Sequence, residues 1–328
     1  MIISKTPYRI SLFGGGTDYP SWFQNYGGQV ISTTIDKYIY ISLRILPNFF
    51  RHKYRIVYSK TENVKKISDI KHSAVREALK LFKIKDGLEI HYDGDLPARS
   101  GMGSSSSFVV GLFNALNSFI DKNYTKRDLS LDCIDFEQRV LNETVGSQDQ
   151  IAASYGGFNL ITFFKDNTFR VSNISKNISY INKLNENLIL VYTGIVRTAN
   201  DIAKTYVDKL SSSNNKIKMQ SILQNVKDAK ILIENRRLDD IGRLLHESWM
   251  KKKDLSPQVT NDKIDFIYNL GLKHGALGGK LLGAGGGGFF LFYVPLEKRN
   301  FFLKKINKFL NIPFKFSHHG SKIILNKS

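Results

Sequence analysis

A run of glycine and serine residues between a predicted strand and a predicted helix is the part of this sequence best suited to chemistry. It extends from Pro97 to Ser107 and follows the segment Leu88–Tyr92, which we predict to be a strand. Apolar residues dominate the segment that follows, and we predict a helix from Ser104 to Ile120. Glycine lets the backbone approach a ligand closely, and free amides at a helix start favour a phosphate. The loop is therefore predicted to hold a polyphosphate, although an ordinary capped turn uses the same residue types.

The loop matches neither of the two common nucleotide-binding fingerprints, because it contains no GxxxxGK[ST] and no GxGxxG sequence. Its support comes from two further glycine clusters, Gly14–Gly16 and Gly283–Gly288, near opposite ends of the chain. Both clusters lie between aliphatic and aromatic residues, whereas flexible glycine linkers are usually flanked by polar sequence. We therefore interpret them as places of close backbone approach or of positive φ angles.

Together the three clusters resemble the motifs of the GHMP kinase superfamily, which includes galactokinases, homoserine kinases and mevalonate kinases. The segment Pro7–Gly14 is similar to the first motif of that superfamily, Leu96–Ser106 to the second, and Gly283–Gly288 to the third. Within the second motif, Arg99 stands where a glycine is common and Met102 where a leucine is common. The resemblance covers nearly the whole chain and implies an ATP-dependent kinase.

A fourth signature, Gly146–Gln150, falls where sugar-kinase members of the superfamily carry their catalytic aspartate. The resemblance implies that Asp149 accepts or orients the proton of the acceptor hydroxyl. Arg9 of the first motif would lie beside it, and the opposite charge would keep that carboxylate ionised. Without the resemblance, the two residues would be interpreted as a loop aspartate and an edge-strand arginine.

The second motif would bind ATP, and the resemblance also implies a site for Mg²⁺. The residues expected to contact the nucleotide are Pro97, Arg99, Ser100, Gly101, Met102, Gly103, Ser104, Ser105 and Ser106. We expect the hydroxyl of Ser105 or Ser106 to coordinate Mg²⁺ together with Glu137, which lies 12 positions before Asp149. These ligands would suffice, because Mg²⁺ keeps several waters. The alternative for Glu137 is a carboxylate on an exposed helix face.

The first and third motifs would bind the phosphoryl acceptor, which the resemblance implies is a sugar. The residues expected there are Gly15, Gly16, Thr17, Asp18, Arg197, Gly285 and Gly286. Galactokinases have Gly-Glu-His-Thr-Asp-Tyr where this chain has Gly14–Tyr19, so Asp18 is retained while the Glu and the His are not. Arg197 is our first candidate for binding a phosphate on the sugar, because a guanidinium matches phosphate in a bidentate geometry. Lys252 and Lys253 are alternatives, and each of these cations could equally be an exposed surface charge.

Two further segments, Tyr192–Gly194 and Leu244–Trp249, resemble the heptose-phosphate kinases of this superfamily more than the galactokinases. That resemblance implies ATP-dependent phosphorylation of the anomeric hydroxyl of D-glycero-D-manno-heptose 7-phosphate, early in GDP-heptose synthesis for surface polysaccharide. Fucokinases share many of the same features. The alternatives are therefore a kinase for a free sugar such as L-fucose or galactose, and a non-catalytic sugar or nucleotide sensor.

The composition is typical of a globular protein in a reducing compartment. Of the 328 residues 42% are hydrophobic, which supports substantial cores, and the single cysteine, Cys133, excludes a disulfide framework within the chain. No apolar run approaches the roughly 20 residues that span a bilayer, and no apolar signal region precedes the first predicted strand. We therefore expect a cytoplasmic monomer or homodimer that has no membrane partner.

The formal net charge of +19 could indicate nucleic-acid binding, but the lysines that produce it are scattered along the chain. The sequence contains no helix-turn-helix pattern, no RNA-binding aromatic motif and no zinc-ligand spacing. We therefore expect ATP and a phosphorylated sugar as the anionic partners, and no nucleic acid.

The predicted elements indicate an α+β protein with two domains, residues 1–180 and 181–328. Predicted strands include Gln29–Ile45 and Leu188–Tyr192, and predicted helices include Asp128–Leu141 and Leu238–Met250. The resemblance implies that the first domain, which binds ATP, resembles ribosomal protein S5 domain 2. It also implies a ferredoxin-like second domain, with the active site between the two.

Overall fold

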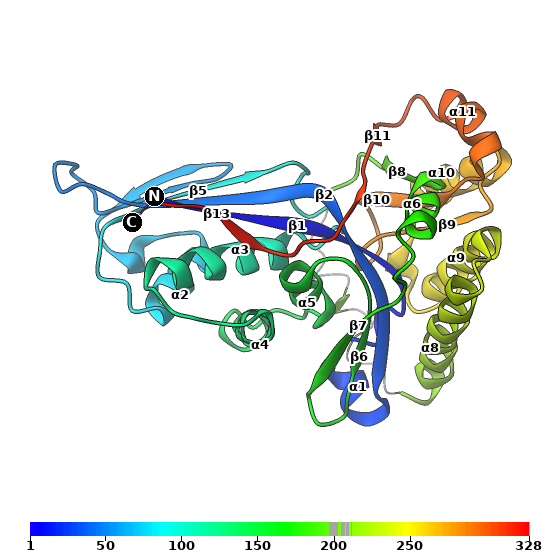
Figure 1. The fold of residues 1–328 in the computed structure, drawn as a ribbon, viewed down its shortest axis with the longest axis horizontal. Helices are drawn as coiled ribbons and strands as arrows, with labels where there is room; N and C mark the ends of the chain where they lie inside the picture. The colour runs from blue at the N-terminus through cyan, green and yellow to red at the C-terminus, as the bar shows by residue number, and fades with distance from the viewer. Residues whose placement is uncertain (197–202, 205–206, 208–209, 211, 328) are drawn as a thin grey trace.

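The computed structural model describes residues 1–196, 203–204, 207, 210 and 212–327, and its larger sheet has nine strands (Figure 1). Six of the strands follow one another in the order β13-β1-β2-β5-β3-β4, while β6 and β12 pair with β2, and β7 pairs with β6. Their bounds are β1 (Ile2–Phe13), β2 (Gly28–Ile45), β3 (Tyr54–Val57), β4 (Thr61–Val64), β5 (Leu88–Gly94), β6 (Phe158–Phe163), β7 (Phe169–Asn173), β12 (Phe316–Ser317) and β13 (Lys322–Asn326).

Helices cover one side of this sheet, and α3 (Ser104–Phe119) is the one that packs most closely on β1 and β2 (Figure 1). Twelve of its 16 residues are buried, as expected for a helix that is apolar on nearly all sides. The other helices of this layer are α2 (Ser73–Leu81), α4 (Lys126–Asp135) and α5 (Gln148–Tyr155). The short helix α1 (Pro20–Tyr26) follows β1, and a 3₁₀ turn η1 (Ile67–Asp69) precedes α2. The position of α3 fixes where the serine-rich loop before it can lie.

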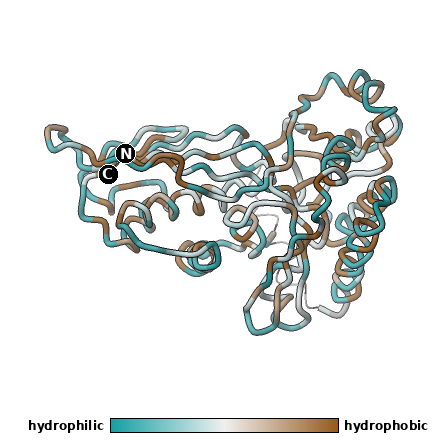
Figure 2. Tube along the Cα trace, in the orientation of Figure 1, coloured by the Kyte–Doolittle hydropathy of each residue, from teal (hydrophilic) through white to brown (hydrophobic). Residues whose placement is uncertain are grey.

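The second sheet is antiparallel and has the strand order β11-β8-β10-β9. Its strands are β8 (Leu188–Tyr192), β9 (Gly278–Leu281), β10 (Phe289–Tyr293) and β11 (Asn311–Ile312). The accompanying helices are α6 (Ile178–Glu186), α8 (Ser213–Glu234), α9 (Leu238–Lys253), α10 (Asp262–Lys273) and α11 (Leu296–Lys305). In Figure 2, α8 and α9 carry hydrophobic and hydrophilic residues in alternation, consistent with helices that pack on one face only. Helix α9 packs on β9 and also contacts β1 of the larger sheet.

The predicted α+β class is confirmed, while two features differ from the predictions. The chain does not stay in the second unit after residue 180, because β12 and β13 return to pair with β2 and β1 of the larger sheet. The helix predicted for Asp128–Leu141 ends at Asp135 and continues as a π-helical turn, η2 (Phe136–Val140). Helix α5 begins at Gln148, so Asp149 lies in its first turn. Within the described part of the chain, no helix is both long and apolar enough to cross a membrane.

Candidate active site

The three glycine clusters converge on one cavity of about 340 Å³ between the two sheets. The lining residues come from β1, from the loop before α3, from the start of α5 and from the α9–β9 region. They include Arg9, Ser11, Gly15, Gly16, Asp18, Arg99, Gly101, Gly103, Ser104, Ser105, Ser106, Glu143, Gln148, Asp149, Lys252, Lys280, Gly283 and Ala284. The segments that the sequence predicted to form one site therefore do share a cavity.

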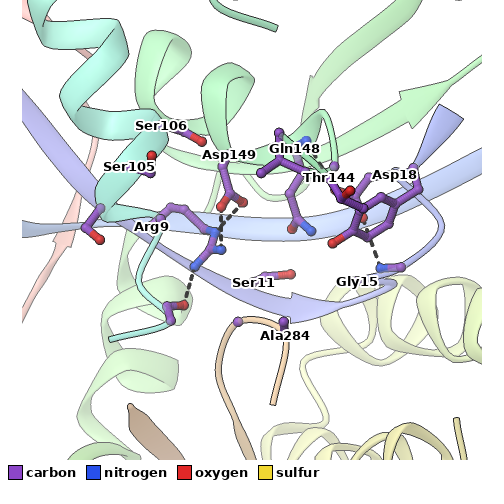
Figure 3. Close-up of a pocket in the computed structure, with 18 of the residues that line it drawn as sticks. Arg9, Ser11, Gly15, Asp18, Ser105, Ser106, Thr144, Gln148, Asp149 and Ala284 are labelled. Atoms are coloured by element: carbon purple, nitrogen blue, oxygen red, sulfur yellow. Dashed lines mark hydrogen bonds and ion pairs between the residues drawn. The ribbon is translucent and has the colours of Figure 1, made fainter. Parts of the chain in front are cut away.

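Arg9 and Asp149 form a bidentate ion pair at the centre of the cavity (Figure 3). Arg9 Nε lies 2.6 Å from Asp149 Oδ1, and Arg9 Nη2 lies 2.6 Å from Oδ2. The third nitrogen, Nη1, donates to the carbonyl of Gly101 at 2.7 Å, which ties the pair to the serine-rich loop. The Arg9 side chain is 5% exposed and that of Asp149 is 22% exposed. Asp149 is thus held in one orientation while one side of its carboxylate faces the cavity.

The serine-rich loop presents the start of α3 to the same cavity. Gly103 is the N-cap residue of α3, and no side chain caps the amides of the first turn. Unpaired amides at the positive end of a 16-residue helix form a favourable site for a phosphate group. Arg99 has a φ of +59°, a conformation that glycine adopts far more easily, which accounts for the glycine expected there. Its exposed side chain also lines the cavity.

The residues predicted to bind the nucleotide divide into two groups. Six of them line the cavity: Arg99, Gly101, Gly103, Ser104, Ser105 and Ser106. The other three do not: Ser100 and Met102 are fully buried, and Pro97 lies at the exposed start of the loop. We infer that Ser100 and Met102 hold the loop in place, since the carbonyl of Met102 accepts the backbone amide of Arg9.

Glu137 is completely buried behind Ser106, on the π-helical turn η2. Burial raises the pKa of Glu137 to about 8, an effect that the hydroxyl of Ser106 and the amide of Gln150 partly oppose. Gln150 Nε2 donates to Oε2, whereas Oε1 has no hydrogen-bond partner among the described residues. A buried carboxylate oxygen without a partner beside a hydroxyl fits a hard cation such as Mg²⁺. The exposed-face alternative for Glu137 is therefore wrong.

Asp18 lies across the cavity from Arg9 and is 1% exposed. Its Oδ1 accepts the backbone amide of Gly16 at 2.9 Å, and its Oδ2 accepts that of Gln148 at 3.3 Å. Burial and, less strongly, the charge of Asp149 raise the pKa of Asp18. Thr17, in contrast, uses its hydroxyl within the protein, where it contacts the carbonyls of Gly14 and Gln29, and it does not line the cavity. Figure 3 shows Asp18 and Gln148 together at one end of the site.

The third glycine cluster packs backbone to backbone against the serine-rich loop. A Cβ added at Gly283 would lie 2.5 Å from the Cα of Gly101, and one added at Gly288 would lie 2.1 Å from the carbonyl oxygen of Ser100. Gly285 and Gly286, which we predicted to bind the acceptor, instead pack against Val259 of the 3₁₀ turn η4 (Pro257–Val259). Gly283 and Ala284 line the cavity in their place.

Six polar residues that line the cavity were not predicted as site residues, and two of the cations that the sequence suggested are not among its described lining residues. These residues are Ser11, Tyr19, Glu143, Thr144, Gln148 and Lys280. Ser11 lies within the first motif and Gln148 within Gly146–Gln150, but the resemblance assigned neither of them a role. Arg197 lies outside the described residues, so its predicted role stays a prediction. Lys253 pairs with Asp265 at 3.1 Å and does not line the cavity, whereas Lys252 lines it and donates to the carbonyls of residues 281 and 283.

Comparisons with known proteins agree with this architecture. The sequence pattern of the GHMP kinases N terminal domain matches residues 69–157, and that of the GHMP kinases C terminal domain matches residues 229–312. The D-glycero-alpha-D-manno-heptose 7-phosphate kinase of Campylobacter jejuni is 30% identical over 94% of this chain and 93% of its own length. The chain therefore belongs to the GHMP kinase family.

Two solved structures have the same fold. A D-glycero-D-manno-heptose 1-phosphate kinase from Bacteroides thetaiotaomicron superimposes with a TM-score of 0.80 at 22% identity, over 100% of both chains. A putative sugar kinase from Campylobacter jejuni superimposes with a TM-score of 0.75 at 26% identity, over 98% of this chain and 97% of that one. The predicted two-domain GHMP kinase fold and the predicted enzyme class, an ATP-dependent sugar kinase, are confirmed.

Proposed function

We propose that this kinase transfers the γ-phosphoryl group of ATP to the anomeric hydroxyl of D-glycero-D-manno-heptose 7-phosphate, giving the 1,7-bisphosphate. We place this step in GDP-heptose synthesis for surface polysaccharide. The 30% identity with a heptose 7-phosphate kinase over nearly the full length supports the choice of acceptor. The observation that carries the chemistry is the Arg9–Asp149 pair, which faces the uncapped start of α3 across a single cavity.

The side chains around this pair support a mechanism that depends on positioning and on charge. The first-turn amides of α3 would hold the polyphosphate so that its terminal phosphoryl group points toward Asp149. Asp149 would accept the proton of the acceptor hydroxyl, and Arg9 fixes the carboxylate in place for that step. Asp18 would accept hydrogen bonds from sugar hydroxyls, since its buried carboxylate lines the cavity.

We assign the Mg²⁺ site to Ser106 and Glu137, because the buried hydroxyl of Ser106 interacts with the Glu137 carboxyl whereas Ser105 is exposed. When bound, Mg²⁺ would neutralise phosphate charge as the phosphoryl group is transferred. Ser106 and Glu137 would orient one another, and Gln150 would support the carboxylate through its hydrogen bond to Oε2.

This assignment predicts different effects for two neighbouring serines. We expect Ser106→Ala to raise the Mg²⁺ concentration needed for half-maximal activity by about 10- to 100-fold, because a metal-site partner is lost. The matched variant Ser105→Ala should change that concentration by less than about threefold. Titration of Mg²⁺ at saturating ATP measures both values. Equal shifts, or a larger shift for Ser105→Ala, would move the hydroxyl ligand to Ser105.

A panel of acceptors tests the proposed activity directly. Release of ADP from Mg-ATP would be measured with D-glycero-D-manno-heptose 7-phosphate, sedoheptulose 7-phosphate, L-fucose, galactose and mevalonate. We expect turnover with the manno-heptose phosphate alone. Turnover with a free sugar only would replace the proposed acceptor by that sugar, and sugar binding without any ADP release would favour a sensor.

A further inference from the structure

Lys280 is a buried lysine in the cavity to which the mechanism above gives no role. It lies on β9, is 5% exposed, and lines the cavity. Its Nζ donates to the carbonyl of Leu12 on β1 at 2.9 Å, a contact between the two sheets. An ammonium group has three hydrogens to donate, and among the described residues the structure gives Lys280 no second acceptor. Two N–H groups are therefore left for a ligand.

The charges around Lys280 favour an anion as that ligand. Burial and, less strongly, the positive charge of Arg9 lower the pKa of Lys280 to about 7. The carboxylate of Asp18 acts in the opposite direction, but its effect is smaller than that of Arg9. Asp18 also accepts two backbone amides already. A negatively charged group near Nζ would add to the smaller counter-charge that Asp18 supplies.

Ser11 provides a second donor in the same cavity as Lys280. It precedes Leu12 on β1, lines the cavity and is 6% exposed, and its Oγ has no hydrogen-bond partner among the described residues. A Cβ added at Gly15 would lie 3.6 Å from that oxygen, so the hydroxyl faces the first glycine cluster. Figure 3 shows Ser11 on the strand that also carries Arg9. An ammonium and a free hydroxyl that line one cavity are donors that suit phosphate oxygens.

The other described cations that line the cavity either donate to protein groups or belong to the loop that we assign to ATP. All three guanidinium nitrogens of Arg9 bond to Asp149 or to Gly101. Lys252 donates to two carbonyls next to the third glycine cluster. Arg99 is exposed and belongs to the loop that we assign to ATP. Lys280 is thus the cation that remains for the acceptor.

We propose that Lys280, assisted by Ser11, binds the phosphate group of the acceptor, so that Lys280 selects a sugar phosphate over the free sugar. The inference rests on the proposed function, because it requires a phosphorylated acceptor. Asp18 would bind sugar hydroxyls, and Lys280 and Ser11 would bind the phosphate of the same molecule. Because Lys280 comes from β9 and Asp18 from the segment after β1, the acceptor would be held by both parts of the protein.

The test compares Lys280→Met with wild type on two acceptors, D-glycero-D-manno-heptose 7-phosphate and D-glycero-D-manno-heptose. We expect KM for the phosphorylated acceptor to rise roughly 10- to 150-fold, which corresponds to the loss of a hydrogen bond to a charged group. KM for ATP, and kcat/KM for the free heptose, should change by less than about twofold. Lys280→Arg should recover part of the lost affinity, since it keeps the charge. Methionine has a similar length and no charge, so it can fill the same space.

Two further variants keep the result interpretable. Lys251→Met is the matched control, because Lys251 lies on α9, donates to Asn225 and does not line the cavity; its kinetics should equal those of wild type. Ser11→Ala removes the hydroxyl with little change in volume and should raise KM for the phosphorylated acceptor by about 3- to 10-fold. If Lys280→Met fails to fold, Ser11→Ala and Lys280→Arg carry the test, and an unchanged KM in both would overturn the proposal.

The remaining outcomes separate this proposal from the proposed function. Equal losses with both acceptors would mean that Lys280 contacts a sugar hydroxyl or the transferred phosphoryl group, which overturns phosphate recognition. Unchanged kinetics in Lys280→Met would overturn it as well. Wild-type turnover of the heptose phosphate would uphold the proposed function in either case. Wild-type turnover confined to free sugars would overturn both proposals.

Discussion

Asp149→Asn is expected to lower kcat by about 10²- to 10⁴-fold, because asparagine can hydrogen-bond to Arg9 but cannot accept a proton. The KM for ATP should stay within about threefold, since the amides and hydroxyls of the serine-rich loop are unchanged. Steady-state release of ADP gives kcat, and direct titration with ATP gives the affinity. The variant is therefore expected to bind ATP with nearly wild-type affinity while its kcat is very low.

The ion pair makes a stability control necessary for this variant. Arg9 is almost fully buried, and removing the charge of its partner leaves the guanidinium without a counter-ion. Thermal unfolding shows whether lost activity reflects lost chemistry or a lost fold. Asp265→Asn is the matched control, because it neutralises an aspartate that pairs with Lys253 outside the cavity. A variant of Asp149 that is folded and retains more than a tenth of wild-type kcat would remove the residue from proton transfer.

Local hydrophobic patterns were sufficient to predict the strands and helices that position the site. Strand β2 was predicted for Gln29–Ile45 and runs Gly28–Ile45, and α9 was predicted for Leu238–Met250 and runs Leu238–Lys253. The family motif commonly has a glycine at position 99, and in this structure Arg99 has a φ of +59°, the left-handed backbone conformation that glycine adopts most easily. Hydrophobic periodicity and the backbone angle of one residue depend on neighbouring residues, so a single sequence is enough to predict them.

The parts that could not be predicted depend on contacts between distant segments. Ser147 and Gln150 have the residue types and spacing of a capping box, but the Ser147 side chain makes no cap hydrogen bond in the structure, and the helix start before Asp149 was not predicted. The apolar period continues across the π-helical turn, so nothing in it indicated that Glu137 would be buried. Lys280 meets a carbonyl 268 positions away, and neither residue belongs to a pattern that implies the other. Its place in the cavity became visible only once both sheets were assembled.

The contact between the two glycine loops leads to the second large expected effect, from Gly283→Ala. Gly283 has a φ of +72°, and an added Cβ would lie 2.5 Å from the Cα of Gly101. Two atoms cannot remain that close, so one of the loops must move. Because Gly101 accepts a hydrogen bond from Arg9, displacement of its loop also disturbs the Arg9–Asp149 pair.

We expect Gly283→Ala to lower kcat/KM for ATP by about 10²-fold, as a displacement of roughly 1 Å at a catalytic site does. The matched control is Gly194→Ala, which has a φ of +71° but whose added Cβ meets only the end of the Lys263 side chain, at 3.6 Å. Both variants should lose about 1–2 kcal/mol of stability from the left-handed backbone. Gly283→Ala should lose about 1–3 kcal/mol more, because of the clash. Chemical denaturation and ATP kinetics measure the two effects separately. If both variants lost the same stability and kept wild-type kcat/KM, the contact between the loops would have no part in holding the ATP site.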